Sequence, residues 1–92
     1  MDRHPHPEEL LEFPCDYPFK AFGANDPEGA FVQAVRDAVG TVTPVALDAI
    51  KVSRSTAGNY LCVTVVVRLH NFQQLEAVYN ALRRVQGLRY LL

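Results

Sequence analysis

The side chains best suited to chemistry are two cysteines and three histidines, and their neighbours give them no catalytic pattern. Cys62 lies within an apolar run, where packing is its expected role. His70 follows that run, at an expected strand-to-helix junction, where a structural or solvated histidine is the simpler interpretation. A nucleophile or general base needs a partner that tunes it, and we find no nucleophile elbow, phosphate-binding glycine loop or metal-ligand spacing. We therefore expect neither an enzyme nor a bound cofactor.

The other candidates for metal or redox chemistry are isolated in the sequence. His4 and His6 form an H-x-H pair, but a zinc site needs further ligands and the partners that orient them. Cys15 and Cys62 form no C-x-x-C motif. We expect no metal site and two reduced thiols, as is usual for a cytoplasmic protein.

Composition and charge exclude further classes. The 92 residues suffice for one domain with a thin core, and 49% of them are hydrophobic. The net charge of −1 argues against a protein that binds nucleic acid through a basic face. No apolar run reaches the ~18 residues of a membrane span, so we expect no membrane partner. Residues 1–10 carry prolines and acids in place of an apolar signal segment, which favours a cytoplasmic location.

The clearest structural signal is the run Tyr60–Leu69. Its odd-numbered residues are all aliphatic, whereas its even-numbered residues are mixed. This period of two predicts a strand with one face in a core and one face of undecided environment.

The rest of the chain divides into segments with strand or helix patterns. We expect a tail over residues 1–12 that could hold one short helical turn, strands over 17–23, 46–53 and 88–92, and helices over 27–39 and 72–86. In the second strand, Ile50 and Val52 should point inward.

The boundaries of these helices and of one turn carry more specific signals. Asn25 or Asp26 would cap the first helix, with Pro27 in its first position, and Asn71 would cap the second. Residues 54–59 are small and polar, which predicts a hairpin turn, and we expect Gly58 to adopt a positive φ there.

The resulting order is βαββαβ. It predicts an α+β, ferredoxin-like domain over residues 13–92, in which a four-stranded antiparallel sheet carries two helices on one face. The RNA-recognition motif shares this fold but stacks bases on aromatic residues of its central strands. Here the central strand offers Tyr60 alone for stacking and the charge is unsuitable, so we expect no nucleic-acid partner.

The uncovered face of the sheet is the leading candidate for function. It should present an apolar centre with a polar rim, which is the pattern of a surface that binds a protein partner or a second copy. A face that is merely solvated is the alternative. The residues concerned are Lys20, Phe22, Tyr60, Cys62, Thr64, Val66 and Arg68.

A second hypothesis places a small ligand at the loop before the first helix. Asn25, Asp26 and Gly29 lie in a segment that resembles the Asp-x-Pro-Gly-like turn of amino-acid-binding ACT domains. The N–H groups at a helix N-terminus suit a carboxylate. An ordinary helix cap is the alternative interpretation of the same residues.

Several motifs together resemble one family of small bacterial proteins. They are E-L-L-E-F-P at residues 9–14, S-T-A-G-N-Y at 55–60 and Q-x-E-x-V-Y-x-x-L at 74–82. This combination is similar to the YbeD family over nearly the whole chain. The resemblance implies a ferredoxin-like fold similar to regulatory ACT-type domains, and it implies no catalytic residues.

Overall fold

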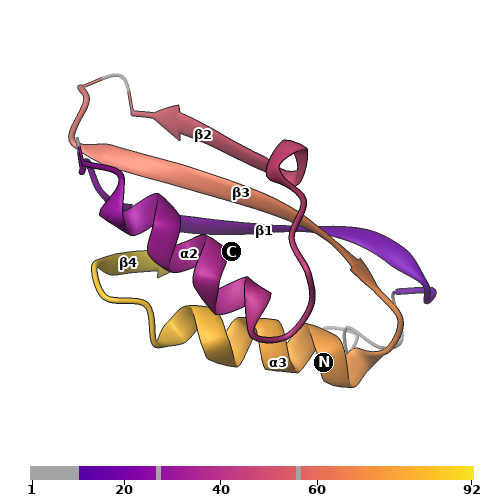
Figure 1. Cartoon of the computed structure of the whole chain (residues 1–92). Helices are drawn as coiled ribbons and strands as arrows, with labels where there is room; N and C mark the ends of the chain where they lie inside the picture. The colour runs from indigo at the N-terminus through magenta and orange to yellow at the C-terminus, as the bar shows by residue number, and fades with distance from the viewer. Residues whose placement is uncertain (1–10, 27, 56) are drawn as a thin grey trace, which may run out of the picture.

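Residues 11–26, 28–55 and 57–92, which the computed structural model describes, form a four-stranded antiparallel sheet with two α-helices on one face (Figure 1). The strand order is β2-β3-β1-β4. This is the predicted ferredoxin-like fold. In chain order the elements are β1 (Cys15–Ala24), α2 (Ala30–Gly40), the 3-10 turn η1 (Leu47–Ala49), β2 (Ile50–Arg54), β3 (Tyr60–Leu69), α3 (Phe72–Arg83) and β4 (Leu88–Leu91).

The sheet is built around β3, which occupies the bounds predicted from its sequence. It pairs with β1 from Cys15 opposite Leu69 to Ala24 opposite Tyr60, and with β2 on its other side. The aliphatic side of β3 faces the helices. Its members are 0–4% exposed, and they are Leu61, Val63, Val65, Val67 and Leu69.

Both helices bury the apolar stripe that their sequences predict. The buried side chains are Phe31, Val35 and Val39 on α2, and Leu75, Val78 and Leu82 on α3. A glycine in β1 makes room for one of them, because a Cβ on Gly23 would lie 2.6 Å from the ring of Phe31.

The first helix starts later than predicted. It begins at Ala30, with Gly29 at its N-cap and φ 78°, and not at position 27. The left-handed backbone at Gly29 interrupts the helical path, so the helix does not extend back through it. Pro27 itself lies outside the described residues.

Other boundaries also move. The second strand is Ile50–Arg54 and not 46–53, because η1 occupies part of that segment, and α3 ends at Arg83 and not at 86. Asn71 caps α3 as predicted, since its side chain accepts a hydrogen bond from the Gln74 N–H at 2.9 Å. Of the expected tail, residues 1–10 lie outside the described residues.

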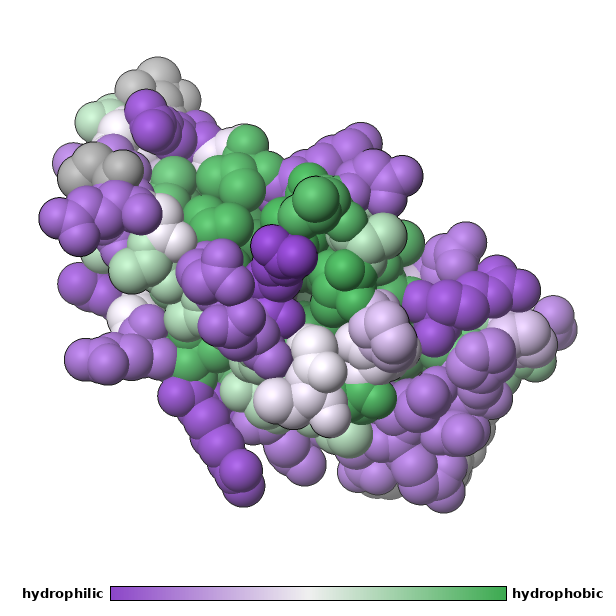
Figure 2. Space-filling model, viewed as in Figure 1, coloured by the Kyte–Doolittle hydropathy of each residue, from purple (hydrophilic) through white to green (hydrophobic). Residues whose placement is uncertain are grey.

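The edge strand β2 is not covered by either helix. Val52 lies opposite the buried Val63, so it faces the helix side as predicted, but it is 47% exposed and not buried. Leu47 in η1 is 71% exposed. Figure 2, which looks onto the helices, shows apolar side chains over β2 and η1 beyond the edge of α2.

The hairpin between β2 and β3 confirms the prediction for Gly58, whose φ is 76°. Ser55 organises this turn: its carbonyl accepts from the Gly58 N–H at 2.8 Å, and its Oγ accepts from the N–H groups of Asn59 and Tyr60, each at 3.2 Å.

The two faces of β3 should respond differently to truncation. We expect Val65→Ala to lower the free energy of unfolding by about 1–3 kcal/mol, because it removes buried methyl groups and leaves a cavity. Val66→Ala, at a position that is 41% exposed, should cost clearly less. Chemical denaturation of both variants measures the difference, and equal losses would contradict the two-layer arrangement.

The conformation of Gly58 gives a second test. Gly58→Ala should destabilise by about 1 kcal/mol, because an L-residue is strained in the left-handed region. A Cβ there would meet no atom within 4 Å, so the cost comes from the backbone alone. Gly40→Ala is the matched control, since Gly40 is also uncrowded and lies in the last turn of α2. A neutral Gly58→Ala would rule out the positive φ in solution.

Candidate functional site

Cross-strand pairing places the side chains of the open face in five rows. Residues directly opposite one another in neighbouring strands project to the same side of a sheet. From one end of β3 to the other, the rows are Arg68 and Asp16; Val66 and Pro18; Lys51, Thr64 and Lys20; Ser53, Cys62, Phe22 and Tyr90; Tyr60 and Ala24. All seven residues expected on this face from the sequence lie there.

The apolar part of this face is larger than the sequence suggested. The rings of Phe22 and Tyr90 lie 5.8 Å apart between centroids. Leu92 also belongs to the face, because it exchanges two backbone hydrogen bonds with Lys20 at 3.1 and 2.8 Å. Tyr60, Val66, Tyr90 and Leu92 are each 41–59% exposed.

Sequence reasoning missed several residues of the face, among them Tyr90, Leu92 and Lys51. The alternation in residues 88–92 could have indicated Tyr90, but its partner depends on the register of β4. That register shifts between Phe22 and Gly23, and no sequence period predicts such a shift. Lys51 lies within the predicted second strand, and its alternation with Ile50 and Val52 could have placed it on the open face.

The face also contains a hollow at its hairpin end. It has a volume of about 190 Å³, and its lining residues are Phe22, Ser53, Arg54, Ser55, Tyr60, Leu61 and Cys62. Its walls are mostly carbon, so it suits an apolar side chain better than a polar one. Pockets that accept one side chain hold the anchor residues of many protein interfaces.

The charged side chains of the face lie in one end row and in the middle row, and most of them are cationic. Arg68 Nη1 lies 3.3 Å from Asp16 Oδ1, and both side chains are more than half exposed. Such an exposed ion pair adds little to stability. Lys20 and Lys51 lie on either side of Thr64.

The candidate ligand loop uses much of its hydrogen-bonding capacity internally. The Asp26 carboxylate accepts from the N–H of Glu28 at 2.9 Å and from the N–H of Phe31 at 3.3 Å. Some of the N–H groups that were expected to bind a ligand carboxylate therefore already donate to Asp26. The negative charge of Asp26 would also repel such a ligand. The N-cap residue of α2 is Gly29 and not Asn25 or Asp26 as predicted, because the helix begins only at Ala30. The Asp26 carboxylate nevertheless stabilises the first turn of α2 through its bond to the N–H of Phe31.

Asn25 has a structural role in the same loop. Its N–H donates to the carbonyl of Asn59 at 3.0 Å, and its side-chain Nδ2 donates to the carbonyl of Gly58 at 2.9 Å. These two bonds join the loop to the hairpin. Its Oδ1 is buried without a hydrogen-bond partner among the described residues.

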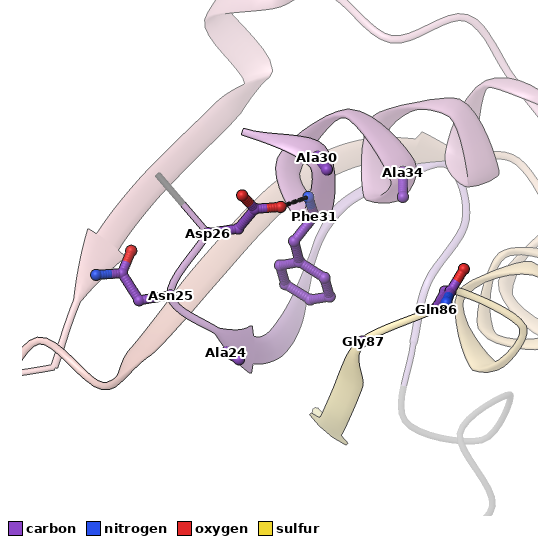
Figure 3. Close-up of a pocket in the computed structure, with 8 residues that line it drawn as sticks. All are labelled: Ala24, Asn25, Asp26, Ala30, Phe31, Ala34, Gln86 and Gly87. Carbon is purple, nitrogen blue, oxygen red and sulfur yellow. Dashed lines mark hydrogen bonds between the residues drawn. The ribbon is translucent and has the colours of Figure 1, made fainter. Parts of the chain in front are cut away.

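An open pocket of about 490 Å³ adjoins this loop (Figure 3). The ring of Phe31 lies between the start of α2 and the segment around Gly87, and the side chain of Asn25 points away from Gln86 and Gly87. The full lining is Ala24, Asn25, Asp26, Ala30, Phe31, Ala34, Gln86 and Gly87. Small apolar side chains dominate it, so the structure offers a ligand few polar contacts there.

Groups capable of catalysis are not assembled in the described parts of the chain. Both cysteines are free, and no group of three or more described His, Cys, Asp or Glu side chains could hold a metal ion. Tyr17 and Tyr79 share a hydrogen bond of 2.9 Å between their hydroxyls. Burial, aided by that bond, raises the pKa of Tyr79 above its ordinary value and keeps it protonated. None of the described helices is long and apolar enough to cross a membrane.

The sequence matches a family model described as "Protein of unknown function (DUF493)" over residues 8–92. The chain belongs to the DUF493 family. A UPF0250 protein of Neisseria meningitidis is 40% identical over 83 residues, which are 89% of each chain. A UPF0250 protein of Edwardsiella ictaluri is 34% identical over 87 residues, 91% of this chain and 93% of that one. The predicted resemblance to YbeD is confirmed, because YbeD belongs to this family of UPF0250 and DUF493 proteins.

A solved structure supports the DUF493 fold described above. The ACT domain from the GTP pyrophosphokinase of Chlorobium tepidum has a TM-score of 0.61, covering 85% of this chain and 97% of that chain. The sequence identity is 15%, so this likeness concerns the fold alone. The DUF493 chain thus has an ACT-domain-like fold, as the resemblance implied.

Asp26 could serve to cap the helix or to bind a ligand, and its hydrogen bonds allow the two roles to be tested apart. We expect Asp26→Ala to lower the free energy of unfolding by about 1 kcal/mol, as the loss of a capping side chain does. Glu28→Ala, its exposed neighbour, should change stability by less than about 0.5 kcal/mol. Thermal or chemical denaturation without any ligand measures both. If Asp26→Ala is as stable as the parent, the carboxylate is not a cap and ligand binding becomes the better explanation for it.

Proposed function

We propose that this protein is a non-enzymatic, regulatory interaction module that binds a protein partner through the open face of its sheet. The observation that carries the proposal is the composition of that face. Tyr60 and Tyr90 are exposed beside the half-buried Phe22 and Cys62, and Val66 is exposed on the other side of Thr64. Charged side chains lie among these residues and at one end of the face. Isolated exposed apolar residues need no explanation, but a contiguous apolar area with a polar rim usually marks an interface.

The second apolar surface, Leu47 and Val52 at the edge of β2, is a weaker candidate. It presents two strongly exposed aliphatic side chains and no exposed aromatic one. Aromatic side chains are enriched at the energetically important centres of interfaces, and the open face has Tyr60 and Tyr90. This comparison favours the open face.

Small-ligand sensing at the loop of residues 25–29 is the alternative function. The pocket of about 490 Å³ beside it supports this alternative. Against it, the Asp26 carboxylate and the Asn25 amide already serve the loop's own structure. Screening amino acids and carboxylates by thermal shift would detect a ligand, because binding to the folded state raises the melting temperature.

The proposal predicts that the apolar centre is needed for association and is not needed for folding. Val66→Glu should leave a folded domain and abolish capture of the partner from a lysate of the cells that make the protein, because burying an unpaired charge in an interface is costly. Val52→Glu is the matched control: it puts the same charge at a valine of similar exposure, 47% against 41%, on the other surface.

Circular dichroism and thermal denaturation establish folding, and mass spectrometry of the captured proteins measures association. Light scattering after size exclusion measures self-association in the same samples. If Val66→Glu folds and captures the same proteins as the parent, the open face is not the working surface. If Val52→Glu alone loses them, the edge of β2 is.

A further inference from the structure

The two lysines of this chain both lie on the open face. Lys20 on β1 and Lys51 on β2 are each opposite Thr64 of β3, so their backbones are two strand spacings apart, about 10 Å. Neither side chain has a hydrogen-bond or ion-pair partner among the residues that the structure describes.

The net charge of the open face differs in sign from the net charge of the whole chain. Among the residues placed on it by strand pairing are three cations, Lys20, Lys51 and Arg68, and one carboxylate, that of Asp16. Asp16 already pairs with Arg68. The chain as a whole carries −1, so the surplus of positive charge belongs to the centre of the open face. Complementarity therefore favours an acidic occupant.

The position of the lysines argues against a second copy as that occupant. Their row is the middle one of the five rows. A face-to-face dimer whose two-fold axis passes through the centre of the sheet brings this row against itself. Four ammonium groups would then meet in a partly desolvated interface, where like charges are costly.

The spacing of the lysines favours a helix. They border β3 on both sides, and a helix with its side chains is about 10–12 Å wide. A helix lying along β3 would set its apolar stripe on Cys62 and Val66, place one anchor side chain in the hollow beside Tyr60, and hold its two flanks over Lys20 and Lys51. Covering a bare sheet face with a helix also completes a layered architecture that is common in proteins.

We propose that the open face binds an acidic amphipathic helix of another protein, whose apolar stripe lies along β3 and whose flanking carboxylates pair with Lys20 and Lys51. This inference rests on the proposed function and adds the chemistry of the partner. The apolar contacts supply affinity, and the two lysines select a helix with negatively charged flanks and orient it as it binds.

Synthetic helical peptides test the proposal directly. The probe is a peptide of about 20 residues, roughly 30 Å when helical, with a leucine stripe flanked by glutamates on both sides. Two sister peptides carry lysine or glutamine in place of every glutamate. We expect the parent protein to bind the glutamate peptide, with an affinity that falls as salt rises, and to bind the lysine peptide at least about tenfold more weakly.

Variants of the protein connect this selectivity to the two lysines. Lys20→Gln with Lys51→Gln should weaken binding of the glutamate peptide about tenfold, and Lys20→Glu with Lys51→Glu should reverse the preference in favour of the lysine peptide. The neutral pair keeps the test valid if the reversed pair folds poorly. Arg84→Gln, which removes an exposed cation beside α3, is the control and should change nothing.

Two further measurements locate the peptide. Amide chemical shifts should move for Cys62, Thr64 and Val66 and stay constant along α3. A carbodiimide, which joins an amine and a carboxylate that touch by an amide bond with loss of water, should link Lys20 and Lys51 to the peptide's glutamates. Absence of a cross-link at both lysines while the glutamate peptide is bound would overturn the proposed docking.

The outcomes separate this inference from the proposed function. Equal binding of the three peptides, no binding of any of them, or unchanged affinity in the lysine variants overturns the acidic helix. If Val66→Glu still loses its cellular partner in that case, the open face keeps its proposed function. A parent protein that dimerises, with a dimer strengthened by Lys20→Gln and Lys51→Gln, makes a second copy the occupant and also overturns the inference.

Discussion

Five aliphatic side chains on one side of β3 are almost completely buried, while Val66 on the other side is 41% exposed. The pleat of the strand imposes this division, because successive side chains project to opposite faces. The buried side gives α2 and α3 a surface to pack on, and their apolar stripes are shielded from water in the core that forms there. The same alternation leaves the other face without a layer. The surface that we assign to function is thus a direct product of the strand that holds the core together.

The parts of the fold that could be predicted are those set by local periodicity. The alternation of Tyr60–Leu69 and the apolar stripes of the helices are properties of short stretches, and each gave the correct element. The start of α2 could not be found in this way. Asp26 is a good cap by residue type, but its carboxylate reaches past a turn to the N–H of Phe31, and the backbone at Gly29 decides where the helix begins. That competition is resolved by three-dimensional geometry.

The candidate site was predictable to the same extent. The residues of β1 and β3 were placed on the correct face because each strand has a regular period. Tyr90 was not, because its position depends on how β4 registers against β1. Lys51 was also left out, although its alternation with Ile50 and Val52 is enough to put it on this face. Val52 shows the same difficulty for burial. The alternation of its strand predicted the face toward which it points, but its exposure depends on how far α2 covers the sheet toward β2. The sequence of the strand does not specify that coverage.

The two hydrogen bonds that Asn25 makes to Asn59 and Gly58 have a consequence for motion. They join a loop and a hairpin that are more than thirty residues apart in the chain, at the end of the sheet where the hollow lies. Local unfolding of the hairpin must also break these hydrogen bonds to the loop before α2, so the two segments unfold locally as one cooperative unit. The stiffness of the hollow is therefore set partly from outside it, by the Asn25 amide, which does not line the hollow.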